Sequence, residues 1–506
     1  MSEILSYSSF DTIQDSIDHL RQIFFTGKSR EISFRKRQLE RLHALVEENE
    51  EKFYEALRKD LNKPKIEALS GDIAPVLDEC LYFLDNLNEL SKDKVTKSRS
   101  LSNKTDKAIV RRDPLGVVLI IGCWNYPVQL SLVPLAGAIA AGNCVILKLS
   151  EVAPHTAALI TELFPKYLDP SCYRVINGSI EETTEVLKYP FDHIFYTGSG
   201  HVGKIVMEAA SKHLAPVTLE LGGKSPAIVT EDADIQLTAN RIAFGKFYNA
   251  GQICIGVDYV LIHTSRLEAF VEAIGRTLNK WYGSNPQASK DYARIVSERH
   301  VDRISALLHN RTSGDVVIGG DIDKKERYIA PTIVTNVRFD DPSLMTDEIF
   351  GPVLPIITFN SLEEVIALVN RKDPPLALYL FTQKKKIQEQ ILKNTRSGGV
   401  CVNDCLMHQA EYSIPFGGVG QSGMGNYHGQ RSFDTFSHER GILIKKQKME
   451  KVIGVRYPPY TDKKATILRL LLVKHPKLLW LKTNRRIFQL LAFIFLLISI
   501  YFKKRK

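Results

Sequence analysis

One cysteine of this 506-residue chain lies in a context that suits covalent chemistry. Cys254 lies in FYNAGQICIGVDYVLI (247–262), an apolar stretch with glycines on both sides of the thiol. A thiolate can attack a carbonyl carbon and form a thioester, whereas a buried thiol can also serve simply as a small core residue. The rest of the sequence must show which of these two roles Cys254 has.

A carboxylate and an amide elsewhere in the chain are candidates to assist such a nucleophile. Glu220 lies inside the apolar PVTLELGG (216–223), where burial should raise the pKa of its carboxylate toward the range of a general base at neutral pH. Asn125 in CWNYP (123–127) follows a predicted strand and offers an amide donor for an oxyanion. A nucleophile, a base and an oxyanion donor are thus available.

A glycine-rich turn in YTGSGHVGK (196–204) suggests phosphate binding. Gly198, Gly200 and Gly203 match G-x-G-x-x-G, which permits a tight turn, close approach of a phosphate and a helix N-terminus aimed at negative charge. The motif alone is weak, since an ordinary strand-to-helix turn also uses glycines. The following strand comes too soon for the usual acidic partner, so we predict an unorthodox nucleotide site.

Two charged residues at the end of an earlier strand could complete that nucleotide site. Lys148 and Glu151 lie in LKLSE (147–151), at the carboxyl end of a predicted strand, where open α/β sheets bind ligands. A cation and a carboxylate there could hold the two ribose hydroxyls. A solvated pair after a strand is the alternative.

Alternating strand and helix patterns must position these residues. Short, almost entirely apolar runs typical of strands buried on both faces occur at 116–122, 143–149, 172–178 and 191–198. They alternate with helical patterns such as PHTAALITELFPKYL and GKIVMEAASKHL. This βαβ series predicts an α/β fold with a parallel, doubly wound sheet.

Composition excludes several classes of protein. Seven cysteines without CxxC pairs indicate neither a disulfide framework nor a metal site, and they fit a reducing compartment. The first 20 residues match neither a signal peptide nor a transit peptide. Residues 445–506 hold 17 of the 67 Lys and Arg residues but two of the 57 acids. The remaining body is therefore mildly acidic, which argues against nucleic acid as a partner.

The basic end surrounds an apolar run, IFQLLAFIFLLISIYF (487–502), with cations at both borders. As a helix it would span roughly 24 Å, somewhat less than a hydrocarbon core of about 30 Å. A buried core helix is one alternative, but the flanking charges and the lack of a polar face favour a transmembrane tail anchor. The preceding residues 446–486 predict a basic amphipathic segment that lies at a membrane surface.

Five separated motifs carry a family resemblance: CWNYP, LELGGKSP, NAGQIC, EIFGPVLP and SIPFGGVGQSGMGNYHG. Together they resemble the NAD(P)-dependent aldehyde dehydrogenase superfamily over residues 10–445. VDYVLI and YHGQRSFDTFSHER resemble its class 3 branch, and the apolar tail resembles that of its membrane-bound fatty aldehyde dehydrogenases. The resemblance implies a Rossmann-like NAD-binding domain, an α/β catalytic domain and a small bridging hairpin, usually in a homodimer.

The same resemblance assigns roles. Cys254 becomes the nucleophile, Glu220 the base and Asn125 the oxyanion donor, with no metal. Lys148 and Glu151 become adenosine-ribose contacts. The other implied cofactor contacts are Gly198, Ser199, Gly200, His201, Val202 and Gly203 at the pyrophosphate, and Glu348 and Phe350 on the nicotinamide side. Tyr126 and Phe416 are expected on the substrate side. NAD is the expected cofactor, with NADP as an alternative because Leu149 replaces a common proline.

The expected reaction is oxidation of medium- to long-chain fatty aldehydes to fatty acids through a thioester on Cys254. Alternatives are a broad or aromatic aldehyde dehydrogenase, a CoA-acylating enzyme and a catalytically dead membrane scaffold. A membrane lipid is an expected partner. The anchor would hold the enzyme, facing the cytosol, on the mitochondrial outer membrane, the endoplasmic reticulum or a lipid droplet.

The expected domains follow the motifs along the chain. N-terminal helices and the NAD-binding domain occupy 1–218, with a bridging segment at 94–112. The catalytic domain occupies 219–424, and a return segment at 425–445 completes the bridging hairpin. The basic segment at 446–486 and the anchor at 487–502 follow.

Overall fold

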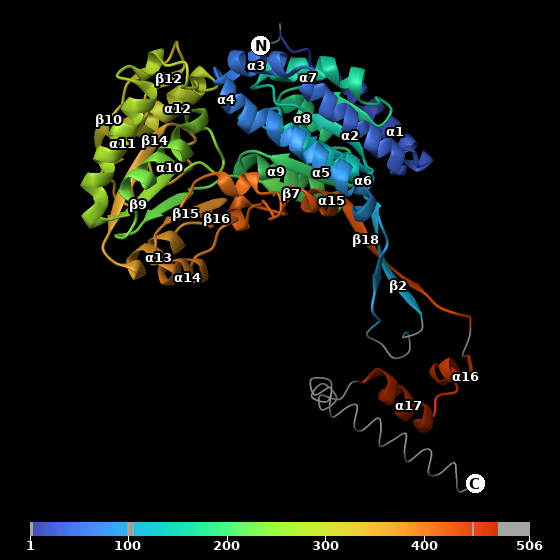
Figure 1. The fold of residues 1–506 in the computed structure, drawn as a ribbon. Coiled ribbons are helices and arrows are strands. Elements are labelled where there is room, and N and C mark those ends of the chain that lie inside the picture. Colours follow the sequence, from blue (N-terminus) through green and yellow to red (C-terminus); the bar gives the residue numbers. More distant parts are fainter. Residues whose placement is uncertain (1–3, 99–102, 104–105, 448–449, 474–506) are drawn as a thin grey trace. The chain divides into compact units, whose positions relative to one another are not determined.

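The computed structural model describes residues 4–98, 103, 106–447 and 450–473. Two compact units divide the chain: Met1–Ser91 with Asp113–His438, and Lys92–Arg112 with Glu439–Lys506. The two large sheets of the larger unit are described in turn (Figure 1).

A six-stranded sheet organises the first half of the larger unit. Its order is β17-β7-β6-β3-β4-β5, and all neighbours are parallel except β17. The strands are β3 (Val117–Ile121), β4 (Cys144–Lys148), β5 (Tyr173–Ile176), β6 (His193–Thr197), β7 (Val217–Glu220) and β17 (Gly423–Met424). Every residue of β3, β4 and β6 is buried, as expected for strands covered on both faces. The four predicted strands and the doubly wound sheet are thus confirmed.

Helices cover this sheet on both faces. Every residue of α6 is buried, because α6 packs between α2, α5 and α15 on the one hand and β3 and β4 on the other. The predicted helices are confirmed as α7 and α9. The helices are α1 (Phe10–Thr26), α2 (Ile32–Glu47), α3 (Glu50–Leu61), α4 (Lys65–Ala68), α5 (Ala74–Leu90), α6 (Gln129–Ala141), α7 (Pro154–Tyr167), α8 (Ile180–Val186), α9 (Gly200–Ser211) and α15 (Gln430–Thr435).

A seven-stranded sheet organises the second half of the larger unit. Its order is β10-β13-β14-β9-β8-β15-β16, parallel except for the edge strand β10. The strands are β8 (Pro226–Val229), β9 (Tyr259–His263), β10 (Asp315–Ile318), β13 (Thr332–Thr335), β14 (Val353–Phe359), β15 (Ala377–Phe381) and β16 (Gly399–Val402). Its helices are α10 (Ile235–Phe247), α11 (Leu267–Tyr282), α12 (Glu298–His309), α13 (Leu362–Asn370) and α14 (Lys385–Asn394). The short strands β11 (Ile322–Asp323) and β12 (Tyr328–Ile329) pair separately.

After β7 the chain leaves the first sheet and continues into the second sheet at β8. β7 pairs with β6 in the first sheet, so the predicted domain boundary between residues 218 and 219 falls inside a strand of that sheet. The chain returns to the same sheet at β17, where Gly423 is opposite Glu220. The strand that carries Glu220 is therefore held on both sides.

The described part of the smaller unit contains a three-stranded sheet and two short α-helices. β1 (Lys94–Thr96) and β2 (Lys107–Pro114) form an antiparallel hairpin, and β18 (Ser437–Ile444) completes the sheet. Parts of both predicted bridging segments, 94–112 and 425–445, therefore share one sheet, whereas α15, which also falls within 425–445, belongs to the larger unit. The helices are α16 (Glu450–Ile453) and α17 (Asp462–Leu472).

Membrane crossing was predicted for 487–502, which lie outside the described residues. Among the residues that the structure does describe, no helix is long and apolar enough to cross a membrane.

The β7–β17 pairing predicts that alanine substitutions at two nearby glycines, Gly420 and Gly423, lower stability by different amounts. A Cβ at Gly423 would overlap the backbone carbonyl oxygen of Leu219, whereas a Cβ at Gly420 would meet open space. Both have left-handed backbones, with φ of 134° and 66°. Gly420→Ala should therefore lose about 1 kcal/mol of stability, and Gly423→Ala clearly more, as measured by urea unfolding. Equal losses in the two variants would show that β17 does not constrain β7.

Candidate active site

A cavity of about 210 Å³ collects seven of the fifteen predicted site residues. These seven are Asn125, Gly198, Ser199, Glu220, Cys254, Glu348 and Phe350. These residues come from five motifs spread over more than 220 positions of the chain. The fold thus brings together the predicted nucleophile, base and oxyanion donor with predicted contacts to the pyrophosphate and the nicotinamide.

Glu220 is the last residue of β7 and is almost fully buried, with 2% of its surface exposed. Neither carboxylate oxygen has a hydrogen-bond partner among the described residues. Burial therefore raises the pKa of Glu220 well above its usual range. A carboxyl group with a raised pKa is a stronger base once it is ionised, as the sequence predicted.

Cys254 follows α10 and a strained turn. Asn249 and Ala250 have left-handed backbones with φ of 50° and 51°, and Gly251 follows with φ of 77°. Burial, and then the carboxylates of Glu348 and Glu220, raise the pKa of the Cys254 thiol. The thiol form therefore predominates at neutral pH, so formation of a thiolate requires a proton acceptor in the cavity.

Asn125 lies in the turn between β3 and α6 and is 1% exposed. Its Nδ2 donates a hydrogen bond to the carbonyl oxygen of Gln252, two residues before the nucleophile, at 3.1 Å. An amide nitrogen has two N–H groups, and this bond uses one of them. The same side chain can therefore both fix the nucleophile loop and offer a donor.

Glu348 and Phe350 lie in the loop before β14. A side chain at Gly222 would overlap the Glu348 carboxylate, so the glycine admits this carboxylate into the cavity. Burial, reinforced by Asp258, raises the pKa of Glu348 to about 8. Phe350 has a left-handed backbone with φ of 49°, and its ring packs edge-on against Trp124 with centroids 5.3 Å apart.

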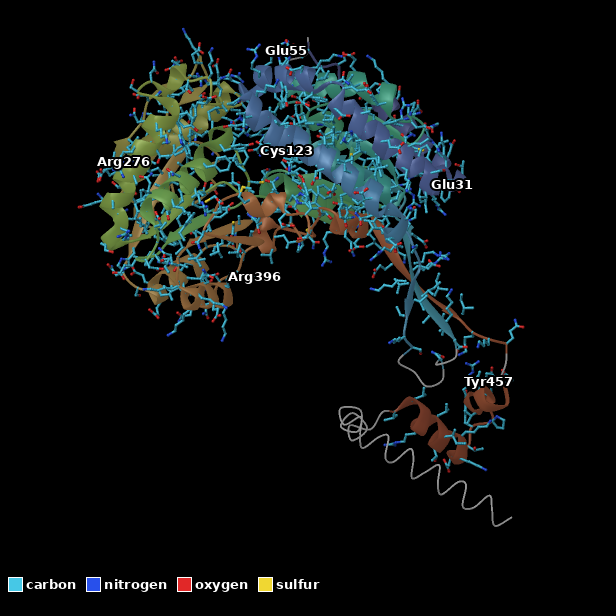
Figure 2. The ribbon with its side chains drawn as sticks, in the orientation of Figure 1. Glu31, Glu55, Cys123, Arg276, Arg396 and Tyr457 are labelled. Carbon is cyan, nitrogen blue, oxygen red and sulfur yellow. The ribbon has the colours of Figure 1, made fainter. Side chains whose placement is uncertain are left out.

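Several lining residues were not predicted from the sequence: Cys123, Trp124, Thr197, Gly222, His300 and Arg303. His300 and Arg303 come from α12, which carries no recognisable motif. The His300 ring packs on Trp124 with centroids 5.1 Å apart, and Arg303 Nη2 donates to the carbonyl oxygen of Ile349 at 2.6 Å. Figure 2 shows Cys123 in the interior of the larger unit, whereas Arg276 lies at its periphery.

The predicted pyrophosphate loop is a short turn followed by the start of α9. β6 ends at Thr197, and Ser199 caps the helix by accepting the Val202 N–H. His201 and Val202 belong to the first helical turn. Gly200 faces open space where a Cβ would meet nothing within 4 Å, whereas a Cβ at Gly203 would crowd Leu221.

This arrangement fits a nucleotide. The open space at Gly200 and the N-terminus of α9 suit a phosphate, because the first N–H groups of a helix lack partners within it. Gly203, in contrast, allows the helix to pack closely on the segment after β7. The two glycines therefore have different physical roles within one motif.

Lys148 and Glu151 lie at the carboxyl edge of the same sheet. Lys148 ends β4, and its Nζ is 3.3 Å from Glu151 Oε2 and 2.7 Å from the Leu149 carbonyl oxygen. Burial lowers the pKa of Lys148. The pair lies outside the 210 Å³ cavity, and its contact with a ribose stays a prediction.

The two predicted substrate-side residues lie in different places. Tyr126 lines a second, mostly apolar cavity of about 460 Å³ together with Phe244, Tyr248, Ile253 and Leu406. Phe416 lines neither cavity. It is buried, with its ring stacked on His428 at 5.0 Å and edge-on to Tyr427 at 5.7 Å.

Comparisons with known proteins agree with this geometry. Residues 7–442 match the aldehyde dehydrogenase family. The chain is 46% identical over 463 residues to aldehyde dehydrogenase family 3 member B1 of Mus musculus, covering 92% of this chain and 97% of that protein. It is 47% identical over 464 residues to family 3 member A2 of Rattus norvegicus, covering 91% and 94%.

Solved structures are similar as well. Substrate-bound AldH of Staphylococcus aureus is 43% identical, with a TM-score of 0.87 and coverage of 90% of this chain and 99% of that chain. The NAD⁺ complex of an aldehyde dehydrogenase from Bacillus cereus is 27% identical, with a TM-score of 0.79 and coverage of 87% and 89%. The chain is therefore an NAD-dependent oxidoreductase that acts on aldehydes, and it belongs to the aldehyde dehydrogenase family.

Proposed function

We propose that this enzyme oxidises medium- to long-chain fatty aldehydes to fatty acids with NAD. The observation that carries the proposal is the convergence of Cys254, Glu220 and Asn125 on one cavity. A larger apolar cavity, lined by Ile253 beside the nucleophile and by Tyr126 beside the oxyanion donor, supports an alkyl substrate.

The chemistry begins with the nucleophile. Water in the cavity accepts the proton of the Cys254 thiol, and the resulting thiolate attacks the aldehyde carbon while the Asn125 amide and the Cys254 backbone N–H stabilise the oxyanion. Bound NAD supplies the hydride acceptor. As the carbonyl re-forms, the acyl group is left on Cys254 as a thioester.

Glu220 acts in the second half of the reaction. Its carboxylate takes a proton from water, which attacks the thioester carbon and releases the fatty acid and the Cys254 thiolate. A CoA-acylating enzyme would pass the acyl group to CoA and need no such base. The buried, unpartnered Glu220 carboxylate therefore favours hydrolysis.

NAD is preferred over NADP in this proposal because of Glu151. A carboxylate that accepts hydrogen bonds from the adenosine ribose repels the additional phosphate of NADP. Its ion pair with Lys148 holds it at the carboxyl edge of the first sheet, which supports this role.

Membrane attachment and dimerisation complete the proposal. The apolar run at 487–502 between two clusters of cations supports a tail anchor that holds the enzyme on a cytosol-facing membrane surface. Long-chain aldehydes partition into the same membrane. The exposed β1 edge supports a homodimer in which this sheet pairs between subunits.

Replacement of the nucleophile gives the first test of this mechanism. Cys254→Ala should lower turnover on the order of 1,000-fold or more, because no other group can form the thioester. NAD binding, measured by calorimetry, should stay near that of the unmodified enzyme. Cys123→Ser is the matched control, since Cys123 lines the same cavity and should leave the enzyme active. Substantial turnover by Cys254→Ala would contradict the assignment.

The base is tested by rapid-mixing kinetics. Glu220→Gln should release about one equivalent of NADH per site in the first turnover and then slow by roughly 100-fold or more, because water is no longer activated. In the unmodified enzyme the pKa of Glu220 is raised, so the ionised fraction and the deacylation rate should both increase with pH. The variant should lose this dependence. Steady turnover by Glu220→Gln at the unmodified rate would remove Glu220 from the mechanism.

The anchor is tested by deletion of residues 483–506. The truncated enzyme should stay in the supernatant after ultracentrifugation and keep its rate on short or aromatic aldehydes. Its rate on long-chain aldehydes presented in vesicles should fall, because the enzyme no longer resides where they accumulate. Continued sedimentation with membranes would place the anchor elsewhere. An unchanged rate on long-chain aldehydes in vesicles would show that membrane attachment does not determine which aldehydes the enzyme oxidises.

A further inference from the structure

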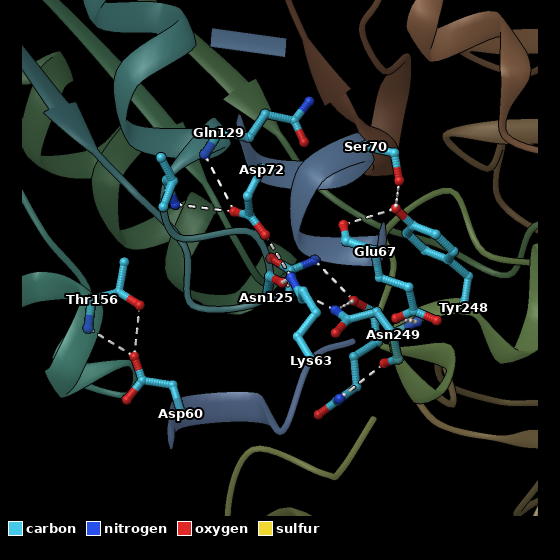
Figure 3. A network of polar contacts seen from close by, with 12 residues as sticks. Asp60, Lys63, Glu67, Ser70, Asp72, Asn125, Gln129, Thr156, Tyr248 and Asn249 are labelled. Carbon is cyan, nitrogen blue, oxygen red and sulfur yellow. Dashed lines mark hydrogen bonds and ion pairs between the residues drawn. The ribbon is translucent and has the colours of Figure 1, made fainter. Parts of the chain in front are cut away.

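A buried ion pair lies directly beneath the active-site loops. Lys63, between α3 and α4, and Asp72, in the helical turn Leu69–Ile73, are 2.7 Å apart (Figure 3). Neither side chain is exposed. Burial of two charges is expensive, and an apolar pair of similar volume is often at least as stable. The contacts of this pair therefore need another explanation.

Lys63 holds the loop that carries the oxyanion donor. Its Nζ donates to the backbone carbonyl oxygen of Asn125 at 2.9 Å and lies 4.1 Å from the centre of the Tyr126 ring. With the bond to Asp72, this gives the ammonium group three partners. No apolar side chain could hold that carbonyl oxygen.

Asp72 holds the other side of the same turn. Its Oδ1 accepts hydrogen bonds from the backbone N–H of Val128 at 3.1 Å and of Gln129 at 3.4 Å. These N–H groups lie at the start of α6, where they lack partners within the helix. The ion pair therefore clamps residues 125–129 from both ends.

The nucleophile loop joins the same network through Asn249. Its Nδ2 donates to the Asn125 carbonyl oxygen at 3.0 Å and to the Gln252 carbonyl oxygen at 3.2 Å (Figure 3). The Glu67 carboxylate accepts the Asn249 N–H at 2.9 Å. Asn249 has a left-handed backbone, which persists where surrounding contacts enforce it.

The segment of residues 63–72 thus contacts both catalytic loops. Lys63 and Asn249 donate to one carbonyl oxygen, that of Asn125, whose side chain in turn holds Gln252. A displacement of the Asn125 backbone would move the oxyanion donor and the nucleophile loop together. Catalytic geometry is sensitive to such shifts, since about 1 Å can cost roughly 100-fold in rate.

We propose that Lys63 and Asp72 are positioning residues, which set the place of the Asn125 amide relative to Cys254. This inference rests on the proposed mechanism, in which Asn125 stabilises the oxyanion. The pair acts through the loop, and neither residue lines the cavity that holds Cys254.

The test measures the rate of the NADH burst with saturating NAD and a short-chain aldehyde. Lys63→Met should slow the burst by roughly 10- to 100-fold while NAD affinity stays unchanged. Asp72→Asn keeps an acceptor for the two N–H groups but loses the charge, so it should slow the burst less. It also serves as the test if Lys63→Met fails to fold. Lys63→Arg should restore part of the rate.

Asp60→Asn is the matched control. Asp60 is also buried and lies three residues from Lys63, but it accepts the N–H of Thr156 at 2.8 Å and that of His155 at 3.1 Å at the start of α7. In the described part of the chain, its carboxylate binds the start of α7 and neither catalytic loop. Its loss should lower stability and leave the burst rate unchanged.

A double-mutant cycle with Asn125→Ala separates positioning from general destabilisation. If Lys63 acts through Asn125, Lys63→Met should have little further effect once the amide is absent. Additive effects, or an unchanged burst in both Lys63→Met and Asp72→Asn, would overturn the positioning role alone. An unchanged burst in Asn125→Ala itself would overturn the proposed mechanism and this inference with it.

Discussion

The burial of two carboxyl groups and a thiol around one cavity is the constraint on which this site depends. Glu220, Glu348 and Cys254 share one small cavity, and burial raises the pKa of each. Glu220 also lacks hydrogen-bond partners in the described structure. A protein that paired Glu220 with a nearby cation would hold its carboxylate ionised and weakly basic. Burial instead keeps Glu220 a stronger base at a cost in stability.

The strands and helices around the site supply that stability. β7 places Glu220 between β6 and β17, and α6 is buried on all sides. Two residues on α12, His300 and Arg303, close the cavity from the second sheet's helices. Rigid elements therefore determine where each reactive group lies, while left-handed turns at Asn249 and Phe350 direct the short loops between them.

Sequence reasoning predicted groups that the structure brings to one cavity, and it missed others that line or support that cavity. Cys254, Glu220 and Asn125 lie in short motifs whose composition reflects their chemistry, and the strands that carry them are apolar enough to recognise. Lys63 and Asp72 occupy an ordinary polar stretch, NKPKIEALSGD, that gives no sign of burial. His300 and Arg303 lie on an amphipathic helix with a polar face. Their contacts arise from packing between segments far apart in sequence, which local patterns do not encode. For the same reason, Phe416 and Tyr126 were both expected beside the substrate, whereas the structure places Tyr126 in the lining of the larger cavity and Phe416 in neither cavity.

The return of the chain at β17 also has a consequence for synthesis on the ribosome. β7 emerges early, but the strand that pairs with its free side, Gly423–Met424, is made about 200 residues later. Until then one edge of the apolar strand β7 is unpaired, and Glu220 is not yet buried. An unpaired strand edge promotes association with other chains. Completion of the first sheet, and with it the active site, must wait for nearly the whole enzyme body. A nascent chain of this enzyme therefore keeps one edge of β7 unpaired for longer than a protein whose domains close one after another.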